Sequence, residues 1–455
     1  MRRFFGTVQH FFHRLLLPSW MAPEWMSMPE KVGFYITTWL GILFMLFYTY
    51  QFFYVLVALI VPPRRYAPAP QNKRYAVVIA ARNESAVLPQ LLKSIAAQSY
   101  PGALLTVFVV ADNCTDNTAE IAYQYGANVF VRHSTTHVGK GYALAFLFDK
   151  IKENYGFEAF DGYFVFDADN VLRPDFVAQM HRAHAAGYAV LTSYRNSKNY
   201  GKSWISAGYA LWFMRESRYL QNPRALLGAS AVISGTGFLI DSRIVIQNGG
   251  WKHFLLTEDI EFTADCILRG ERVGYCHEAE LFDEQPETFA ASWRQRKRWA
   301  KGMFGVMRYY GAALFKGALR ASWPCYDMAV NVMPAFLISL FQLGATGFLF
   351  LLNWVLTGSV SLVLLHFLLD FFTFGYGIFL LLGAVALLSE WRHIHCPKWR
   401  AILLLFTFPV FMLTYIPISL AALFWRHATW QPIAHTRALD VKDIENGAVL
   451  RKPDK

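Results

Sequence analysis

Four long hydrophobic runs frame the chain, one before and three after a stretch of mixed polarity. Residues 32–61 carry no charged side chain, and about 20 apolar residues are enough to cross a bilayer. After Pro324 come three further runs, at residues 326–356, 362–388 and 401–425. Pro409 and Pro417 lie in the last run, where they predict a kink or a turn back. The pattern therefore predicts one transmembrane helix at 32–61 and about three within 326–425.

Between these runs, residues 62–302 alternate short apolar segments with helical ones. Strands are expected at 75–80, 105–110, 128–131 and 163–166, and helices at 86–99 and 118–125. Fully apolar strands that alternate with helices indicate a parallel sheet covered on both faces. The sequence thus predicts an α/β domain, in which ligands bind beyond the carboxyl ends of the strands.

The segments that flank the domain are shorter and less regular. Within residues 1–31, the first 20 mix Arg2, Arg3 and Arg14 with Phe and Leu and end near Pro18. They predict an amphipathic helix that lies on the membrane, with a frayed tail as the alternative. Residues 303–325 are expected to form interfacial helices, and residues 426–455 a C-terminal tail whose side of the membrane stays open.

Composition and charge place the domain next to a membrane. The chain is 55% hydrophobic and 16% charged, which is too apolar for an ordinary soluble protein. Its net charge of +11 comes largely from runs beside the hydrophobic segments, such as 62–65 and 294–301. An anionic cytoplasmic leaflet explains such runs better than nucleic acid, so no nucleic-acid partner is expected.

Compartment and topology follow from the cysteines and the basic residues. The five cysteines form no CxxC or Cys/His ligand spacing, which fits a reduced compartment without structural zinc. A cytosolic domain anchored in the cytoplasmic membrane is therefore expected, with membrane lipids as neighbours. Arg2 and Arg3 argue against this topology. One transmembrane helix before a cytosolic domain would place the N-terminus outside, whereas positive charges tend to stay on the cytosolic side.

The strongest candidates for chemistry are two carboxylates after the strand at 163–166. Alternation places Asp167 and Asp169 on the same side, as two hard oxygen ligands for Mg²⁺ or Mn²⁺ that a diphosphate and water would complete. An ordinary acidic turn, which Asn170 and Pro174 would also suit, is the alternative.

Polar residues also follow the first two strands. Asn83 and Glu84 come after the first strand and Asp112 after the second, each in a loop that opens onto a helix. Such loops can bind a nucleotide through backbone N–H groups, whereas Asn83 and Asp116 are also good helix caps. Lys140 lies between two glycines and is either a phosphate ligand or a turn lysine.

Three further motifs complete the set. Thr257, Glu258 and Asp259 open a predicted helix, so the acids are either a general base or N-terminal dipole partners, with Thr257 as the cap. The small residues Gly235 and Thr236 suit a loop against a sugar. A basic, aromatic run could bind a diphosphate and stack a sugar, or merely flank a membrane helix; its candidate residues are Gln295, Arg298 and Trp299.

In this order the motifs resemble those of the membrane-bound family 2 glycosyltransferases, which include hyaluronan, chitin, cellulose and poly-N-acetylglucosamine synthases. The resemblance covers residues 75–302, and the joint set is far more specific than any single motif. It implies a GT-A α/β domain inserted between transmembrane segments. It also implies a nucleotide-sugar donor, most readily a UDP-sugar, and a divalent cation.

The resemblance implies a role for each motif. Asn83, Glu84 and Asp112 would contact the nucleoside, Lys140 the diphosphate, and Asp167 and Asp169 the nucleobase and the metal-diphosphate. Asp259, beside Glu258, would deprotonate the acceptor hydroxyl, and Arg298 would stabilise the leaving diphosphate. Gln295, Trp299, Gly235 and Thr236 would hold the acceptor. Attack opposite the nucleotide would invert the anomeric carbon.

These roles predict an enzyme that extends a β-linked polysaccharide at the cytoplasmic membrane. Two departures weaken the polymerase reading, since residues 300–310 lack a counterpart of the cellulose synthase gating loop and the C-terminal block is small for a polymer channel. The Gln-x-x-Arg-Trp pattern also occurs in ceramide glucosyltransferase-like enzymes, so a lipid acceptor is the first alternative. A non-catalytic export scaffold is the second. A homo-oligomer or an export partner would supply a wider exit path.

Overall fold

The computed structural model describes residues 22, 26–333, 335–425 and 435–447. Contacts divide the chain into one unit of residues 1–49 and 337–375, and a second of residues 50–336 and 376–455. The predicted amphipathic helix at 1–20 lies outside the described residues, as do the tail segments 426–434 and 448–455.

The first unit consists of long apolar helices that pack against one another. It contains the first part of α2 (Met28–Ile60), α13 (Ala335–Thr357) and the first half of α14 (Leu362–Ser389). The Ser27 hydroxyl donates to Asn353 at 3.0 Å, and the Ser361 hydroxyl donates to Glu30 at 2.5 Å. A Cβ on Gly33 would lie 2.6 Å from the Leu364 side chain, so the absence of one lets α2 and α14 pack closely.

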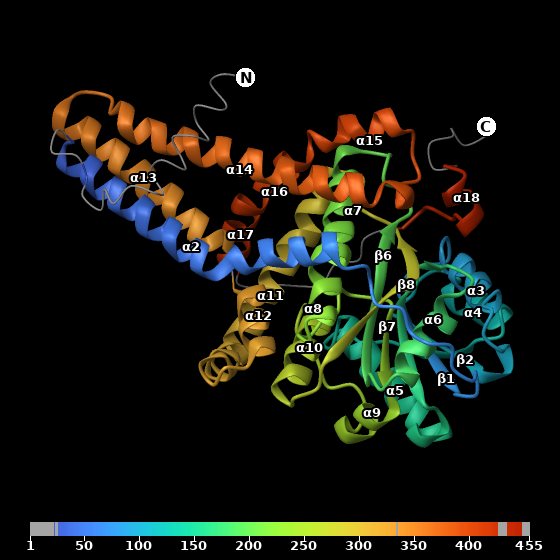
Figure 1. Cartoon of the computed structure of the whole chain (residues 1–455). Coiled ribbons are helices and arrows are strands. Elements are labelled where there is room, and N and C mark those ends of the chain that lie inside the picture. The colour runs from blue at the N-terminus through green and yellow to red at the C-terminus, as the bar shows by residue number, and fades with distance from the viewer. Residues whose placement is uncertain (1–21, 23–25, 334, 426–434, 448–455) are drawn as a thin grey trace. The chain divides into compact units, whose positions relative to one another are not determined.

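The second unit is built on an eight-stranded sheet whose order is β3-β2-β1-β4-β7-β6-β8-β5. Figure 1 shows β1, β2, β6, β7 and β8 of this sheet. Its strands are β1 (Tyr75–Ala81), β2 (Leu105–Asp112), β3 (Asn128–Arg132), β4 (Gly162–Asp167), β5 (Val171–Leu172), β6 (Val190–Ser197), β7 (Phe238–Asp241) and β8 (Val273–Asp283). The first four strands run parallel, close to the predicted positions.

The sheet is mixed rather than wholly parallel, which corrects the expectation from the sequence. β7 runs antiparallel to both β4 and β6, and β5 runs antiparallel to β8. The reversal follows a glycine loop in which Gly237 adopts a φ of +67° and donates its N–H to the carbonyl of Val165 at 3.0 Å. Only glycine adopts such a φ without strain, so the loop can turn β7 back along β4.

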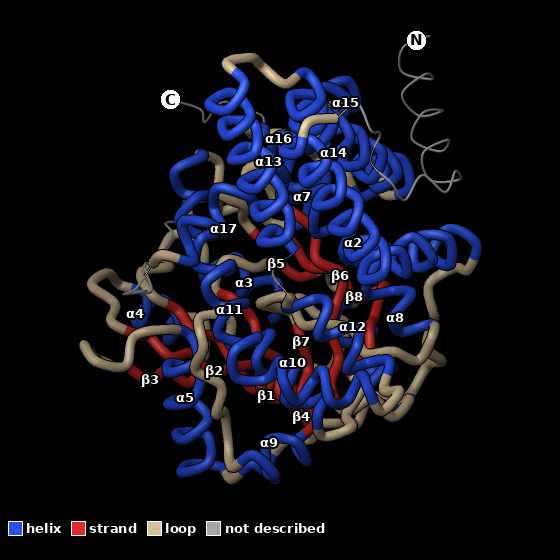
Figure 2. Tube along the Cα trace, turned by 90° about the vertical axis from the view of Figure 1, so that its left-hand side faces the viewer, coloured by secondary structure: helices blue, strands red, loops and turns tan. Residues whose placement is uncertain are grey.

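Helices cover both faces of this sheet, as the apolar strands predict (Figure 2). On one face lie α3 (Leu88–Ala96), α4 (Thr118–Gln124) and α6 (Phe176–Ala185); on the other lie α5 (Lys140–Tyr155), α9 (Ser242–Asn248) and α10 (Glu258–Leu268). Tyr75 and Val77 of β1 enter the first core, whereas Ala76 and Val78 enter the second. Both faces of β1 are therefore covered, in keeping with its fully apolar sequence.

The remaining helices lie between these strands or after them along the chain. They are α7 (Trp204–Glu216), the π-helix η3 (Ser217–Gln221), α8 (Asn222–Leu226), α11 (Phe289–Leu319), α12 (Trp323–Val332), α15 (Lys398–Leu405), α16 (Phe408–Leu413), α17 (Tyr415–Leu423) and α18 (Val441–Glu445), with 3-10 turns η1 (Gly102–Leu104), η2 (Phe157–Ala159) and η4 (Trp391–His393). α7 packs against α16 at Gly208, where a Cβ would lie 2.4 Å from the Phe411 ring. The sheet domain and the C-terminal apolar helices are therefore joined within one unit.

Three helices in the described part of the chain are long and apolar enough to cross a membrane: Met28–Ile60, Ile338–Thr357 and Leu362–Ser389. A fourth span is possible if Lys398–Leu405 and Phe408–Leu423 act together across their bend of 44°. This bend lies where Pro409 predicts one.

The run expected as one span at 326–356 is divided. α12 ends at Val332, and Met333 is extended, with a φ of −65° and a ψ of 130°. The residue that follows is a proline in the sequence, and a proline disfavours helical geometry in the residue before it.

A buried ion pair fastens α12 to the sheet domain. Arg224 of α8 donates to both carboxylate oxygens of Asp327, at 2.7 and 2.9 Å, and both side chains are at most 2% exposed. The hydroxyls of Tyr50 and Tyr54 donate to the same carboxylate at 2.7 and 3.1 Å. Both carboxylate oxygens of Asp327 therefore have hydrogen-bond partners within an otherwise apolar run.

Candidate active site

The loops after β1 and β2 are tied together at the carboxyl end of the sheet. Asn83, at a φ of +57°, accepts the N–H of Thr115 at 2.7 Å. The N–H of Glu84 donates to the hydroxyl of Thr118 at 2.9 Å. Asp116 accepts the N–H of Thr118 at 3.1 Å, but the N-cap position of α4 is occupied by Asn117, so Asp116 is not the cap that the sequence predicts. Asn83 thus shapes the loop, and the carboxylate of Glu84 remains directed elsewhere.

Asp112 has an internal partner that the sequence did not suggest. Its carboxylate pairs with the guanidinium of Arg132 at the end of β3, and the two side chains are 6% and 10% exposed. Arg132 also donates to the carbonyl of His137 at 2.6 Å. Any contact between Asp112 and a nucleoside would therefore include Arg132 as a neighbour.

Asp167 and Asp169 lie at the end of β4, as predicted. Asp167 pairs with Lys140, and its own N–H donates to the Thr236 hydroxyl at 2.8 Å. Asp169, which is 5% exposed, accepts the backbone N–H of Glu284 at 2.9 Å. Burial opposes its charge, but His435 and Lys198 hold the pKa of Asp169 below its usual value. Both carboxylates are therefore fixed by backbone and cationic contacts.

These two carboxylates suit a cation that a substrate shares. Among the described residues, no group of three or more His, Cys, Asp and Glu side chains forms a protein-only metal site. The Asp167 side chain is 35% exposed, and its Oδ2 accepts no hydrogen bond within the described part of the chain. A pair of hard oxygens with open positions fits Mg²⁺ or Mn²⁺ when phosphate and water complete the coordination.

Lys140 joins this pair to the predicted base. It begins α5 between Gly139 and Gly141, and a Cβ on Gly141 would lie 2.3 Å from the carbonyl of His253. Its ammonium pairs with Asp167, donates to the carbonyl of Gly235 at 2.7 Å and lies 3.9 Å from Glu258. Burial lowers the pKa of Lys140, but the two carboxylates outweigh burial and raise it.

Glu258 and Asp259 open α10, but Thr257 does not cap the helix as predicted. Thr257 occupies the N-cap position, yet its hydroxyl donates to no helical group and accepts no helical N–H. Burial raises the pKa of Asp259, although the N–H of Ile260 and Lys140 oppose the shift. Burial, with the charge of Asp259, raises the pKa of Glu258 to about 7. Such carboxyl groups are stronger proton acceptors than exposed ones.

α11 places the basic, aromatic motif against α10 and α7. A Cβ on Gly302 would lie 2.5 Å from the Thr257 side chain, so this glycine permits a close approach to the start of α10. The charge of Arg298 lowers the pKa of Glu258. The Trp299 ring meets Tyr209 and Phe213 of α7 edge-on, at centroid distances of 5.7 and 6.2 Å.

Gln295 carries an unsatisfied group. Its Oε1 is buried and, within the described residues, accepts no hydrogen bond. Buried polar atoms are rarely left without a partner unless a ligand or water supplies one. This observation supports a substrate contact at Gln295 more directly than its place in the motif does.

Gly235 and Thr236 lie beside Lys140 and Asp167. Besides the contact with Lys140, the N–H of Gly235 helps to lower the pKa of Asp259. The Thr236 hydroxyl accepts the N–H of Asp167 and donates to Asn170. The loop thus connects Asp167, Lys140 and Asp259, and its predicted contact with an acceptor stays a prediction.

The C-terminal segment 435–447 contributes a residue that the sequence did not reveal. His435 lies 3.0 and 3.1 Å from the two carboxylate oxygens of Glu84. The N–H groups of Thr436 and Arg437 donate to the Glu284 side chain at 3.1 and 2.8 Å. Burial opposes the imidazolium, but Asp169 and Glu84 raise the pKa of His435 to about 10. No local pattern in a polar tail indicates this long-range contact.

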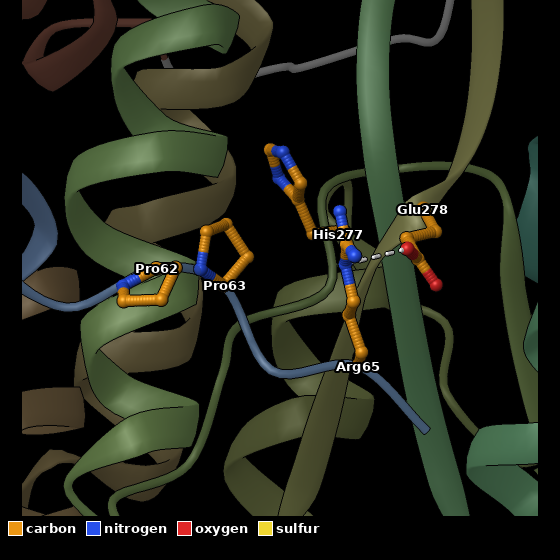
Figure 3. A pocket seen from close by; sticks show the side chains of 5 residues that line it. All are labelled: Pro62, Pro63, Arg65, His277 and Glu278. Atoms are coloured by element: carbon orange, nitrogen blue, oxygen red, sulfur yellow. Dashed lines mark ion pairs between the residues drawn. The ribbon is translucent and has the colours of Figure 1, made fainter. Parts of the chain in front are cut away.

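A separate surface groove does not belong to this site. It has a volume of about 560 Å³ and is lined by Pro62, Pro63, Arg65, His277 and Glu278 (Figure 3). Arg65 pairs with Glu278 at 3.3 Å, and burial lowers the pKa of His277 to about 4. The groove therefore presents a paired acid and a neutral imidazole, and no candidate residue lines it.

Comparison with known proteins agrees with this geometry. The model of the family described as glycosyltransferase like family 2 matches residues 70–302. A probable glycosyltransferase of Bacillus subtilis is 29% identical over 268 residues, which cover 53% of this chain and 58% of the relative. A beta-monoglucosyldiacylglycerol synthase of Nostoc is 26% identical over 298 residues, with 61% and 59% covered. A poly-beta-1,6-N-acetyl-D-glucosamine synthase of Staphylococcus aureus is 27% identical over 237 residues, with 50% and 54% covered.

The matched regions cover only part of each curated relative. The chain spans between about half and three fifths of the length of these curated relatives. Among solved structures, a mannosyltransferase from Pyrobaculum calidifontis in complex with GDP-mannose and Mn²⁺ aligns with a TM-score of 0.55 at 16% identity. The alignment covers 88% of this chain and all of that one. The predicted GT-A fold is thereby confirmed.

Proposed function

The chain belongs to the family 2 glycosyltransferases, and from that premise we propose that it transfers a hexose from a nucleotide-sugar to an acceptor hydroxyl with inversion. The observation that carries the proposal is the connection through Lys140, which links Asp167 to Glu258 beside Asp259. A donor-binding carboxylate pair and a basic carboxyl group are thus held within one network.

Asp259 is the proposed general base. Its raised pKa makes it a better proton acceptor near neutral pH, and the N-terminus of α10 aims it rigidly. One base is enough for an inverting displacement, because the acceptor oxygen attacks as its proton leaves. Glu258, whose pKa is raised to about 7, shares the negative charge of this pair.

Cationic groups are proposed to stabilise the negative charge that develops on the leaving diphosphate. Arg298 and Lys140 are positioned as fixed cations, and fixed charges stabilise a transition state without reorganisation. Asp167 and Asp169 would hold Mg²⁺ or Mn²⁺, which when bound supplies Lewis-acid stabilisation of the diphosphate. The mannosyltransferase with the same fold binds GDP-mannose and Mn²⁺, which supports a nucleotide-sugar and a divalent cation here; a UDP-sugar is the proposed donor.

Glu84 and Asp112 are proposed to contact the nucleoside, near the loop that Asn83 shapes. His435 joins them, because its imidazolium binds Glu84 and offsets the charge of Asp169. The donor pocket would otherwise present several carboxylates to an anionic diphosphate.

The acceptor is proposed to bind beside Gln295 and Trp299, with Gly235 and Thr236 between it and the donor. A growing β-linked polysaccharide is the leading acceptor, in line with the poly-N-acetylglucosamine synthase relative. A membrane lipid is the second candidate, favoured by the apolar surroundings of Trp299, which packs in one cluster with Phe411 and Met412 of α16. The diacylglycerol-modifying relative supports the same alternative.

We place the domain on the cytosolic face of the cytoplasmic membrane, where nucleotide-sugars are available. The test is nucleotide release by the reconstituted protein, followed by product analysis. High-mass carbohydrate would support the polysaccharide acceptor, and a glycolipid with one sugar as the sole product would support the lipid acceptor. Binding of nucleotide without any transfer would favour an export scaffold.

A further inference from the structure

Lys198 carries its ammonium group into the interior of the domain. It directly follows β6, and only 2% of the residue is exposed. Within the described residues, its Nζ makes no hydrogen bond and no ion pair within 4.0 Å. A lysine ammonium has three N–H donors, and buried polar groups without a partner are rare in proteins.

The backbone holds Lys198 beside the donor carboxylates. Its N–H donates to the carbonyl of Asp283 at 2.8 Å, which fixes the residue where β6 runs along β8. Burial lowers the pKa of Lys198, while Asp169, Glu284 and Glu84 act in the opposite direction. Asp169, Glu84 and Glu284 also raise the pKa of His435, which contacts Glu84 directly. The N–H of Glu284, the residue after Asp283, donates to Asp169 at 2.9 Å, so the end of β8 brings the backbone of Lys198 close to this carboxylate.

We propose that the ammonium of Lys198 donates a hydrogen bond to a phosphate oxygen of the nucleotide donor. This inference rests on the proposed function and adds a donor-binding residue to it. The carboxylates of Asp169, Glu84 and Glu284 would repel a diphosphate. The Lys198 ammonium, which makes no hydrogen bond among the described residues, can offset that repulsion. A phosphate oxygen would also satisfy the donors that the protein leaves open. The alternative is a structural lysine that water satisfies.

The test is titration calorimetry on the full chain in lipid nanodiscs. UDP and GDP are compared with the nucleosides uridine and guanosine, with and without Mn²⁺. Lys198→Met keeps most of the apolar stem of the side chain and removes its charge. We expect about a tenfold loss of affinity for the preferred nucleoside diphosphate, because a charge-assisted hydrogen bond of ordinary strength disappears. Nucleoside affinity should stay unchanged, since nucleosides carry no phosphate.

Thermal unfolding adds a readout that separates binding from structure. The nucleotide-free Lys198→Met protein should unfold at or above the wild-type temperature, because an unpaired buried charge is removed. Its stabilisation by the nucleoside diphosphate should shrink. Lys202→Met, four residues farther along the chain, is the control and should bind like wild type.

Equal affinity for the nucleoside diphosphate in wild type and Lys198→Met would overturn the proposal and leave a structural lysine. A parallel loss of nucleoside affinity would overturn it as well, because it would indicate a distorted pocket. If Lys198→Met fails to fold, Lys198→Gln provides the same comparison with a neutral polar side chain. Absence of nucleotide binding by wild type would instead refute the proposed function itself.

Discussion

Lys140 offers the most informative single substitution, since its ammonium links Asp167 with Glu258, beside the proposed base Asp259. Lys140→Met removes the ammonium that pairs with Asp167 and lies 3.9 Å from Glu258, while it keeps most of the buried stem. The side chain of Lys140 is 14% exposed, that of Asp167 35% and that of Glu258 10%. The variant therefore leaves one partly hydrated and one buried carboxylate without their cation.

The expected loss of stability is moderate. Breaking a fully buried pair costs about 3–5 kcal/mol, but water can reach Asp167, so we expect about 1–3 kcal/mol. Catalysis should suffer more specifically. If one charge-assisted hydrogen bond of about 1.5–3 kcal/mol is lost in the transition state, the rate falls by roughly 10- to 150-fold.

The pH profile should change in a defined direction. Lys140 lowers the pKa of both Glu258 and Asp259, so its removal raises both. A smaller fraction of the base is then ionised at neutral pH. The acid limb of kcat/KM should therefore move to higher pH, and raising the pH should recover part of the activity.

The assay is nucleotide release against pH by the reconstituted protein, with melting temperature as a check on folding. Lys152→Met, at the exposed end of the same helix, is the matched control and should leave the rate and the profile unchanged. A Lys140→Met protein with a wild-type rate and an unmoved acid limb would refute the reasoning. Lys140 would then be a structural partner of Asp167 only.

Three further predictions follow from the same contacts. Glu258→Gln should move the acid limb of kcat/KM to lower pH. Glu258 and Asp259 repel each other, so removal of the Glu258 charge lowers the pKa of Asp259; an unmoved limb would show that the two acids are uncoupled. His435→Ala should weaken UDP binding about tenfold in calorimetry, by the loss of a charge-assisted contact, whereas tighter binding would mark the C-terminal segment as self-blocking. Gly302→Ala should lower kcat about tenfold or more and spare UDP affinity, because the new Cβ lies 2.5 Å from Thr257 and displaces α11; a normal kcat would show that α11 shifts without consequence.

Local patterns predicted the parts of the site that depend on strand ends and helix starts. Asp167 and Asp169 follow an apolar strand, and Asp259 begins a helix, so their positions are consequences of short segments. The parallel order of β1 to β4 also follows from alternating apolar strands and helices. The reversal of β7 was missed, because a four-residue apolar strand after a glycine loop does not reveal its direction.

The missed residues depend on contacts between distant segments. Arg132 meets Asp112 across the ladder between β2 and β3, and His435 reaches Glu84 from the far end of the chain. The sequence does not predict the burial of Lys198, because nothing in a polar strand end distinguishes a buried lysine from an exposed one. The absent cap at Thr257 has a similar origin, since the close approach of α11 at Gly302 surrounds that side chain.

The central claim is tested most directly by nucleotide release from purified, lipid-reconstituted protein. Wild type and Asp259→Asn are offered a panel of UDP- and GDP-sugars with Mg²⁺ or Mn²⁺, together with N-acetylglucosamine oligosaccharides and diacylglycerol as acceptors. We predict release with one donor by wild type and a loss of at least about a hundredfold in Asp259→Asn, which still binds the nucleotide. Equal release by both proteins would contradict the account, because the base of the transfer would then lie elsewhere.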